Sequence, residues 1–334
     1  MWFIAITVVL IVGLVVHFVQ KYSNRQTYIS TLAKNMPAAG KSIGDTAEET
    51  IVRERVFRVI RLTISYIFLV ILGIFMIFPF YWMVITSLKT EGEISLMVPT
   101  FFPKVLALSN IPNAIIRLNA WRLLYNTITV GIWSTVGTLI TTVLAAFAFS
   151  RIKFPGREFV FTLFLGTMMI PGEMMVITNY LTVAKMGLLE SKAGAITSMI
   201  IPFWVSVFYI FQLRQNFKQI PNELYYAAKV DGKTDWQYLW KVMVPLASPA
   251  LITIFILKLM GTWNSYIWPN LVANQEDWRL ITNGLRSYSP SPSGEPHQGL
   301  QMAATFVVTV PLLLLFIFFR KYIMRGVGRA GLKG

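Results

Sequence analysis

IPNELYYAAKVDGKTDWQYLWKVMVPLASPA, residues 220–250, is a polar interruption in a chain that is otherwise mostly apolar enough for a membrane. Residues 222–223 form a plausible helix start, because a small polar residue followed by an acid suits the positive end of a helix dipole. Residues 223–229 are good helix formers, and the Asp-Gly pair at 231–232 predicts a sharp turn. This half of the stretch therefore predicts one short helix and its stop.

The other half of the stretch predicts a second helix. Apolar residues recur at three- and four-residue spacing over 236–244, so one stripe of that helix is apolar, and Pro245 is expected to end it. Aromatic side chains lie on one face, and Lys233 and Lys241 lie elsewhere. The whole stretch predicts a helix–turn–helix between two membrane spans, which is a candidate docking surface.

The composition is typical of a polytopic membrane protein. Hydrophobic residues make up 55% of the chain and charged residues only 13%, and the mean hydropathy is +0.59. The absence of cysteine excludes disulfides and cysteine-ligated metal sites, and two histidines leave little for histidine catalysis or metal binding. The net charge of +15 is better explained by basic cytoplasmic loops at a membrane than by nucleic acid.

Apolar runs along the chain predict an all-α membrane protein with seven spans. Residues 2–19 form a first run without the features of a signal peptide, and we interpret it as an extra N-terminal helix, with an interfacial segment as the alternative. Residues 20–61 are polar; Lys41 and Ser42 suggest a phosphate-binding loop, but the required upstream glycine is Asn35. Six further spans are predicted at 62–87, 121–149, 158–181, 193–213, 246–268 and 300–319.

The distribution of basic residues predicts the orientation. Segments expected inside hold 21 of the 30 lysines and arginines; they are 20–61, 150–157, 214–245 and 320–334. The amino terminus is then outside, and the carboxyl terminus and the loop 214–245 are cytoplasmic. Two external loops are expected, 88–120 and a flexible 269–299 that ends in a Pro/Ser-rich run.

The spacing of residues inside the polar stretch resembles the coupling motif of ATP-binding-cassette (ABC) importer permeases. The order that follows the motif is Ala227-Ala228, three intervening residues, Gly232, nine intervening residues, and Val242-x-Val244-Pro245. Its glutamate position holds Tyr226, so either Tyr226 or the nearby Glu223 takes the usual acidic role. Further segments resemble the smaller maltose-type permease and cover about residues 60–334 in the same order; they are Asn126-Thr127, Arg151-x-x-Phe154-Pro155-Gly156, Met168-Met169-Ile170-Pro171, Gly187-Leu188-Leu189, Trp263-Asn264-Ser265-Tyr266-Ile267-Trp268-Pro269 and Ala330-Gly331-Leu332-Lys333-Gly334.

The resemblance implies a six-helix importer core and a set of partners. The expected segments are an extra helix at 1–20, a linker at 21–61, a permease domain at 62–325 with coupling loop 214–245 and external loop 269–299, and a tail at 326–334. The implied partners are a second homologous permease, two ATPase subunits that carry ATP and Mg²⁺, an extracellular sugar-binding protein and an oligosaccharide. The chain itself is expected to hold no cofactor or metal and to catalyse no reaction.

The resemblance also assigns roles along the coupling loop. Ala227 and Ala228 are small so that the helix seats closely on the ATPase, and Gly232 permits the turn. Asp231 would cap or pair there. In the tail, contact with the ATPases is expected through Gly331, Lys333 and Gly334, with a disordered terminus as the alternative. For the loop 269–299 the alternatives are a scoop into the binding protein and a passive linker.

Lys258 is the residue in the sequence that most strongly indicates a substrate path. A charge at the centre of a span costs on the order of 2.5–3.5 kcal/mol, so Lys258 should face a cavity or an acid. Gly261, Thr262 and Ser265 share its helical face. Either Lys258 attracts an acidic, uronate-bearing sugar or it pairs with an acid of the partner permease. The tentative path also includes Trp263, Asn264 and Tyr266, for which an aromatic belt at the membrane surface is the alternative.

Two other classes of protein were weighed. An ion-coupled secondary transporter would show ionisable groups at mid-membrane and inverted repeats, whereas this chain offers Lys258 and Glu173. A membrane-embedded enzyme would need clustered acids, histidines or a nucleophile with its base, and no such cluster is found in the sequence.

Overall fold

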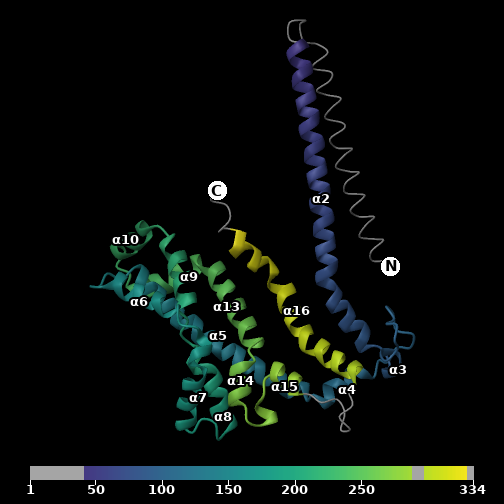
Figure 1. Ribbon diagram of the computed structural model, residues 1–334. Helices are drawn as coiled ribbons and strands as arrows, with labels where there is room; N and C mark the ends of the chain where they lie inside the picture. Colours follow the sequence, from purple (N-terminus) through teal and green to yellow (C-terminus); the bar gives the residue numbers. More distant parts are fainter. Residues whose placement is uncertain (1–40, 288–296, 329–334) are drawn as a thin grey trace. The chain divides into compact units, whose positions relative to one another are not determined.

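The computed structural model describes residues 41–287 and 297–328, and every regular element in these ranges is helical (Figure 1). The chain divides into two compact units, Met1–Pro79 and Phe80–Gly334. Helix α2 (Lys41–Ser87) begins in the first unit and continues into the second. The expected helix at 2–19 and the tail residues Gly331, Lys333 and Gly334 lie outside the described residues.

Three helices are long and apolar enough to cross a membrane unbroken. They are Val56–Ser87 of α2, α5 (Ala120–Ser150) and the first part of α16 (Gln298–Gly328). Three bent pairs satisfy the same test of length and composition, which gives up to six spans. Each of the six spans predicted between residues 62 and 319 overlaps one of these candidates, while the run at 2–19 lies outside the described residues.

Three of the predicted spans are bent pairs of helices. One pair bends by 82° between α6 (Arg157–Thr167) and Gly172–Lys185, which comprises η2 (Gly172–Met175) and α7 (Val176–Lys185). The next bends by 44° after α8 (Lys192–Ile200) and η3 (Ile201–Phe203), before α9 (Val207–Lys218). The third bends by 77° ahead of α13 (Ser248–Trp263). Proline lacks a backbone donor and favours such breaks, and Pro171 and Pro202 lie at the first two.

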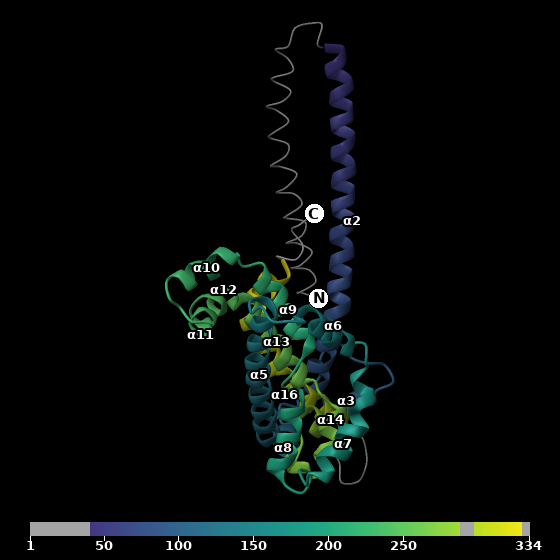
Figure 2. The ribbon, with the colours of Figure 1, turned by 90° about the vertical axis from the view of Figure 1, so that its left-hand side faces the viewer.

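In the second unit, α5 is the helix on which the others pack. It contacts α8, α9 and α13, and Figures 1 and 2 both show α10 (Asn222–Val230) toward one end of it and α7 and α8 toward the other. Gly137 permits one close approach, because a Cβ there would lie 2.2 Å from Nε1 of Trp204 in the second helix break. The α10 end is filled by a buried cluster that includes Phe147, Phe217 and Tyr238.

The opposite end of α5 is fastened to the segment expected to be a flexible external loop. Asn126 Nδ2 donates to the carbonyls of Asp277 (2.8 Å) and Arg279 (3.0 Å), and Thr127 Oγ1 accepts from the Ile281 amide at 2.8 Å. The described part of 269–299 is therefore mostly folded, into α14 (Ile267–Val272), η5 (Glu276–Trp278) and α15 (Ile281–Ser287). Its Pro/Ser-rich run lies outside the described residues.

The other expected external loop, 88–120, is also ordered. It contains α3 (Glu91–Ile94) and α4 (Asn110–Arg117), and α4 packs on α16. Glu93 is buried and accepts hydrogen bonds from Thr100 Oγ1 (2.5 Å) and from the Lys104 amide. The Glu93 carboxylate thus holds together the part of this segment between residues 93 and 104.

Candidate docking surface and membrane cavity

The turn after α10 has the geometry predicted for Gly232. The Gly232 amide donates to Lys229 and the Lys233 amide donates to Ala228, which is the pair of bonds that defines a Schellman helix end. Gly232 has a φ of +70°, a conformation that a side chain disfavours. The helix over 223–229 and its stop are therefore confirmed.

A polar network joins the two helices of the loop, and sequence reasoning missed it. Asp235 Oδ1 accepts from Tyr225 Oη at 2.7 Å and pairs with Lys229 Nζ at 2.8 Å, and the bond to Asp235 raises the pKa of Lys229. Asp235, not Asp231, is thus the acid that pairs within the described loop; Asp231 ends α10 through its backbone. The partners lie too far apart in sequence for a helical spacing rule to find them.

The second helix of the loop begins where Thr234 and Gln237 form a capping box, a readable signal that sequence reasoning overlooked. It runs through α11 (Asp235–Tyr238), a π-helical turn η4 (Leu239–Met243) and α12 (Val244–Leu246). Pro245 was expected to end it, but it lies inside α12. The π-turn accommodates the shifted backbone bonds just before a residue that lacks its N–H.

One face of α10 is left uncovered. Glu223, Tyr226, Ala227 and Val230 fall at three- and four-residue spacing, share that face and are all exposed. Val230 is 88% exposed and Tyr226 55%. On the other face, Ala228 is buried in the cluster with Tyr238, so only Ala227 of the alanine pair is open to a partner. Trp236 and Trp240 add exposed apolar area from the second helix, in an edge-to-face pair with ring centroids 5.5 Å apart.

Arg151 fastens this loop to the end of α5. It is 8% exposed, and its guanidinium donates to Asn222 Oδ1 at 2.7 Å and to the carbonyls of Phe217 (2.9 Å) and Ile220 (2.5 Å). Because these acceptors lie between α9 and α10, the arginine fixes the junction between a span and the loop. The first residue of the Arg-x-x-Phe-Pro-Gly segment thus has a structural role, which is to hold the junction of α9 and α10 against α5.

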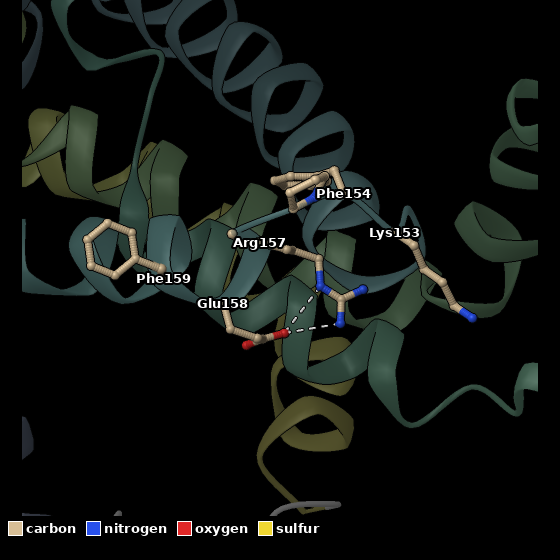
Figure 3. Close-up of a pocket in the computed structure, with 7 residues that line it drawn as sticks. Lys153, Phe154, Arg157, Glu158 and Phe159 are labelled. Carbon is tan, nitrogen blue, oxygen red and sulfur yellow. Dashed lines mark hydrogen bonds and ion pairs between the residues drawn. The ribbon is translucent and has the colours of Figure 1, made fainter.

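A neighbouring buried arginine fixes the start of α6. Arg214 donates to both oxygens of Glu158 at 2.7 Å and lies over the Phe161 ring. Beside it, residues 153–159 line an open hollow of about 600 Å³ (Figure 3). Figure 3 shows Arg157 turned toward Glu158 and Lys153 directed away from that pair. A single stretch of chain lines this hollow, so it is a concave turn rather than an assembled site.

The second cavity lies between spans and contains Lys258. It has a volume of about 320 Å³. Gly261, Thr262 and Ser265 line it with Lys258, which confirms the predicted polar face of α13. Lys258 Nζ donates to the Phe203 carbonyl at 3.1 Å.

The other residues of the tentative path lie elsewhere. Trp263 is only 4% exposed and belongs to a core cluster with α4 and α16, so its ring is not available to stack on a sugar. Asn264 Nδ2 donates to the Met260 carbonyl at the end of α13. Tyr266 lies against the Arg286 guanidinium, 5.1 Å from the ring centroid. Of the five path residues, the cavity brings together Lys258 and Thr262, and it adds Trp268, which the path had left out.

Residues 137–329 match the family described as binding-protein-dependent transport system inner membrane component. The match extends over more than half of the chain. The chain belongs to this family. Membership favours a binding-protein-dependent permease over the ion-coupled carrier that was weighed against it.

Curated relatives cover most of this permease. It is 27% identical to the diacetylchitobiose uptake system permease protein NgcG of Streptomyces coelicolor, over 80% of this chain and 87% of NgcG. It is 31% identical to the lactose transport system permease protein LacG of Rhizobium radiobacter, over 75% of this chain and 89% of LacG. These relatives are transport permeases, not enzymes.

A solved structure supports the fold of this permease. The crystal structure of a bacterial ABC transporter involved in the import of the acidic polysaccharide alginate contains a chain with a TM-score of 0.69 and 23% identity. The likeness covers 81% of this chain and 97% of that one. The all-helical permease fold expected from the sequence is therefore confirmed.

Proposed function

We propose that this permease is one of two membrane subunits of an ABC importer that carries a sugar or oligosaccharide delivered by an extracellular binding protein. Two ATPase subunits would bind ATP and Mg²⁺ and drive the cycle, so that this chain contributes the path and the docking surface. The family description supports dependence on a binding protein, and the diacetylchitobiose and lactose permeases among its relatives support a sugar as the substrate.

The uncovered face of α10 is the observation that carries the docking role. An exposed apolar patch held on a rigid two-helix loop is typical of a protein-interaction site. Here Tyr226 and Val230 are exposed, while the Tyr225–Asp235 bond and the Schellman turn fix the loop's own shape. The loop therefore presents a preformed surface to a cleft on the ATPase.

Glu223 is proposed to supply the acid that the motif usually carries at the position of Tyr226. It lies three residues earlier, one helical turn away on the same exposed face. A carboxylate there reaches the same side of an ATPase cleft, and Tyr226 adds apolar contact beside it.

The α10 end of the permease is proposed to face the cytoplasm. Arg151, Lys153, Arg157 and Arg214 gather there from the end of α5, the start of α6 and the second half of α9, as the enrichment of basic residues on the inner side predicts. The tail at 326–334 would lie on the same side, next to the ATPases.

The experiment compares native protein with Glu223→Ala in the complex reconstituted in lipid. Sugar-stimulated ATP hydrolysis and the affinity for the ATPase subunits are measured together. Loss of a docking carboxylate should weaken ATPase binding by about tenfold or more, since removing one partner of a close interfacial charge pair typically costs this much. The control is Glu190→Ala, an exposed acid just before α8. Unchanged stimulation in Glu223→Ala, or sugar uptake driven by an ion gradient without ATP, would count against the proposal.

A further inference from the structure

The cavity beside Lys258 is lined by residues from several separate helices of the permease. Ser134 comes from α5, Phe203 from η3, Tyr209 from α9 and Trp268 from α14, and Lys258 projects from the middle of α13. Its volume of about 320 Å³ lies at the small end of the range of about 300–1,000 Å³ for ligand pockets. The space suits one small polar ligand, or one unit of a longer chain.

The lining has the chemistry of a site for a charged sugar. Hydroxyl groups surround the space and can exchange hydrogen bonds with a polyol; they belong to Ser134, Ser206, Tyr209, Thr262 and Ser265. Phe203 and Trp268 provide aromatic surface, in an edge-to-face pair with centroids 5.9 Å apart. Of the described lining residues, Lys258 alone carries a charge.

The cavity also lies against a break in a span. Between η3 and α9 the chain leaves helical geometry at 204–206, and Val205 and Ser206 line the space. Non-helical backbone at membrane depth is tolerated where it is buried in protein or lines a cavity. Broken helices of this kind form substrate sites in other transporters.

The hydrogen bond to the carbonyl at this break does not explain why a charged side chain lies here. The Phe203 oxygen accepts from Lys258 Nζ (3.1 Å) and also from Thr138 Oγ1 (3.0 Å), so it is satisfied without the lysine. An ammonium group has three donors, and one bond to a carbonyl requires no charge. The ammonium also lies over the Phe203 ring, 5.7 Å from its centroid, but none of the described lining residues is an acid, so the cavity itself supplies no counter-charge.

We propose that this cavity binds the carboxylate of a uronate-bearing sugar during transport, with Lys258 as its counter-charge. The inference rests on the proposed function, because it names the class of sugar for the path of a sugar importer. The solved alginate transporter supports only the fold, so the acidic substrate stands on the cavity's own residues.

The absence of cysteine from the chain allows a direct test of the cavity's charge. Ser265→Cys places a single thiol in the lining, and Asn264→Cys places one on the adjacent exposed residue, outside the lining. Each is made with Lys258 present and with Lys258→Gln, in the complete complex with cysteine-free partners. Two methanethiosulfonate reagents of similar size, one a sulfonate and one a quaternary ammonium, then compete for the thiol.

With Lys258 present, the sulfonate should modify Ser265→Cys faster, and Lys258→Gln should lower the sulfonate-to-ammonium rate ratio by about tenfold or more, as expected for a charge focused in a cleft. The ratio at Asn264→Cys should change far less. Galacturonate should slow the modification of Ser265→Cys, and galactose at the same concentration should not.

Three results would overturn the proposal. A rate ratio that Lys258→Gln leaves unchanged means that an acid of the partner permease already neutralises the lysine. Equal protection by galacturonate and galactose means that the cavity does not recognise the carboxylate. No reaction with either reagent means that the cavity is closed to solutes. None of these measurements needs ATP hydrolysis, so they fail or succeed separately from the coupling experiment on Glu223.

Discussion

Val230→Ala should weaken ATPase binding by an amount that follows from the exposure of this side chain. Val230 is 88% exposed, so shortening it removes almost nothing from the permease's own core, and alanine is the better helix former. If α10 docks through this face, the change removes two carbons from the interface. At about 0.8 kcal/mol for each buried CH₂ group the loss is roughly 1.6 kcal/mol, or a dissociation constant raised roughly tenfold to twentyfold.

The assay is titration of the purified ATPase subunits onto the permease pair in lipid nanodiscs, with binding followed directly. Val98→Ala is the matched control, because Val98 is 77% exposed and lies in the 88–120 segment rather than on α10. A change of less than twofold for Val230→Ala would refute the docking face. So would an equal change for both variants, because it would trace the effect to something other than α10.

Two further predictions concern local stability. Gly232→Ala adds a Cβ that meets no atom within 4 Å, so its only cost is the strain of the left-handed backbone, about 1–2 kcal/mol. Hydrogen exchange at the Lys233 amide should therefore quicken roughly five- to thirtyfold. The control is Gly166→Ala, whose Cβ also meets open space and which should leave that exchange rate unchanged. At Glu93, the Thr100 hydroxyl holds the pKa of the carboxyl below its ordinary value of 4.5. The ionised Glu93 carboxylate therefore stabilises the folded state above pH 4.5, and this contribution is lost as the pH falls through the lower pKa of the folded protein. The thermal midpoint of native protein should therefore fall more steeply below about pH 4.5 than that of Glu93→Gln, and parallel pH profiles would contradict the assignment.

Local sequence rules predicted the coupling loop because its structure is mostly local. The helix stop at Gly232 depends on bonds between residues three and five apart, and a glycine after a short helix is the usual signal for it. The Tyr225–Asp235 bond joins residues ten apart across that turn. No periodicity marks such a pair, so only the folded loop shows it.

The spans were located but their bends were not. Apolar composition is similar on both sides of a break, so hydropathy shows where a span lies and not whether it is straight. Proline is tolerated inside membrane helices, and Pro311 lies within α16 without ending it. The residues that decide a bend are the neighbours that satisfy the freed carbonyls, such as Thr138 at Phe203.

The lining of the Lys258 cavity agrees with the prediction where helical period was used, and it does not agree where neighbours in sequence were grouped. Thr262 follows Lys258 by four residues and shares its face, and both line the cavity. Trp263 follows by five, which turns it away from that face, and it is buried in another core. The aromatic cluster in the sequence is therefore divided between two sites in the fold.

The loop is joined to two walls of the Lys258 cavity by different means. Arg151 ties Asn222 and the end of α9 to α5, the helix that carries Ser134 into the cavity. The second helix of the loop leads through Ala247 directly into α13, which carries Lys258. A displacement of α10 would therefore be passed to α5 through the buried Arg151 guanidinium, and to α13 through the continuous backbone. At its far end α5 is also held by Asn126, whereas α13 is separated from the loop by a 77° bend. If α10 docks on the ATPase as proposed, relative movement of these two walls would alter the cavity between them and so link the docking surface to the proposed substrate site.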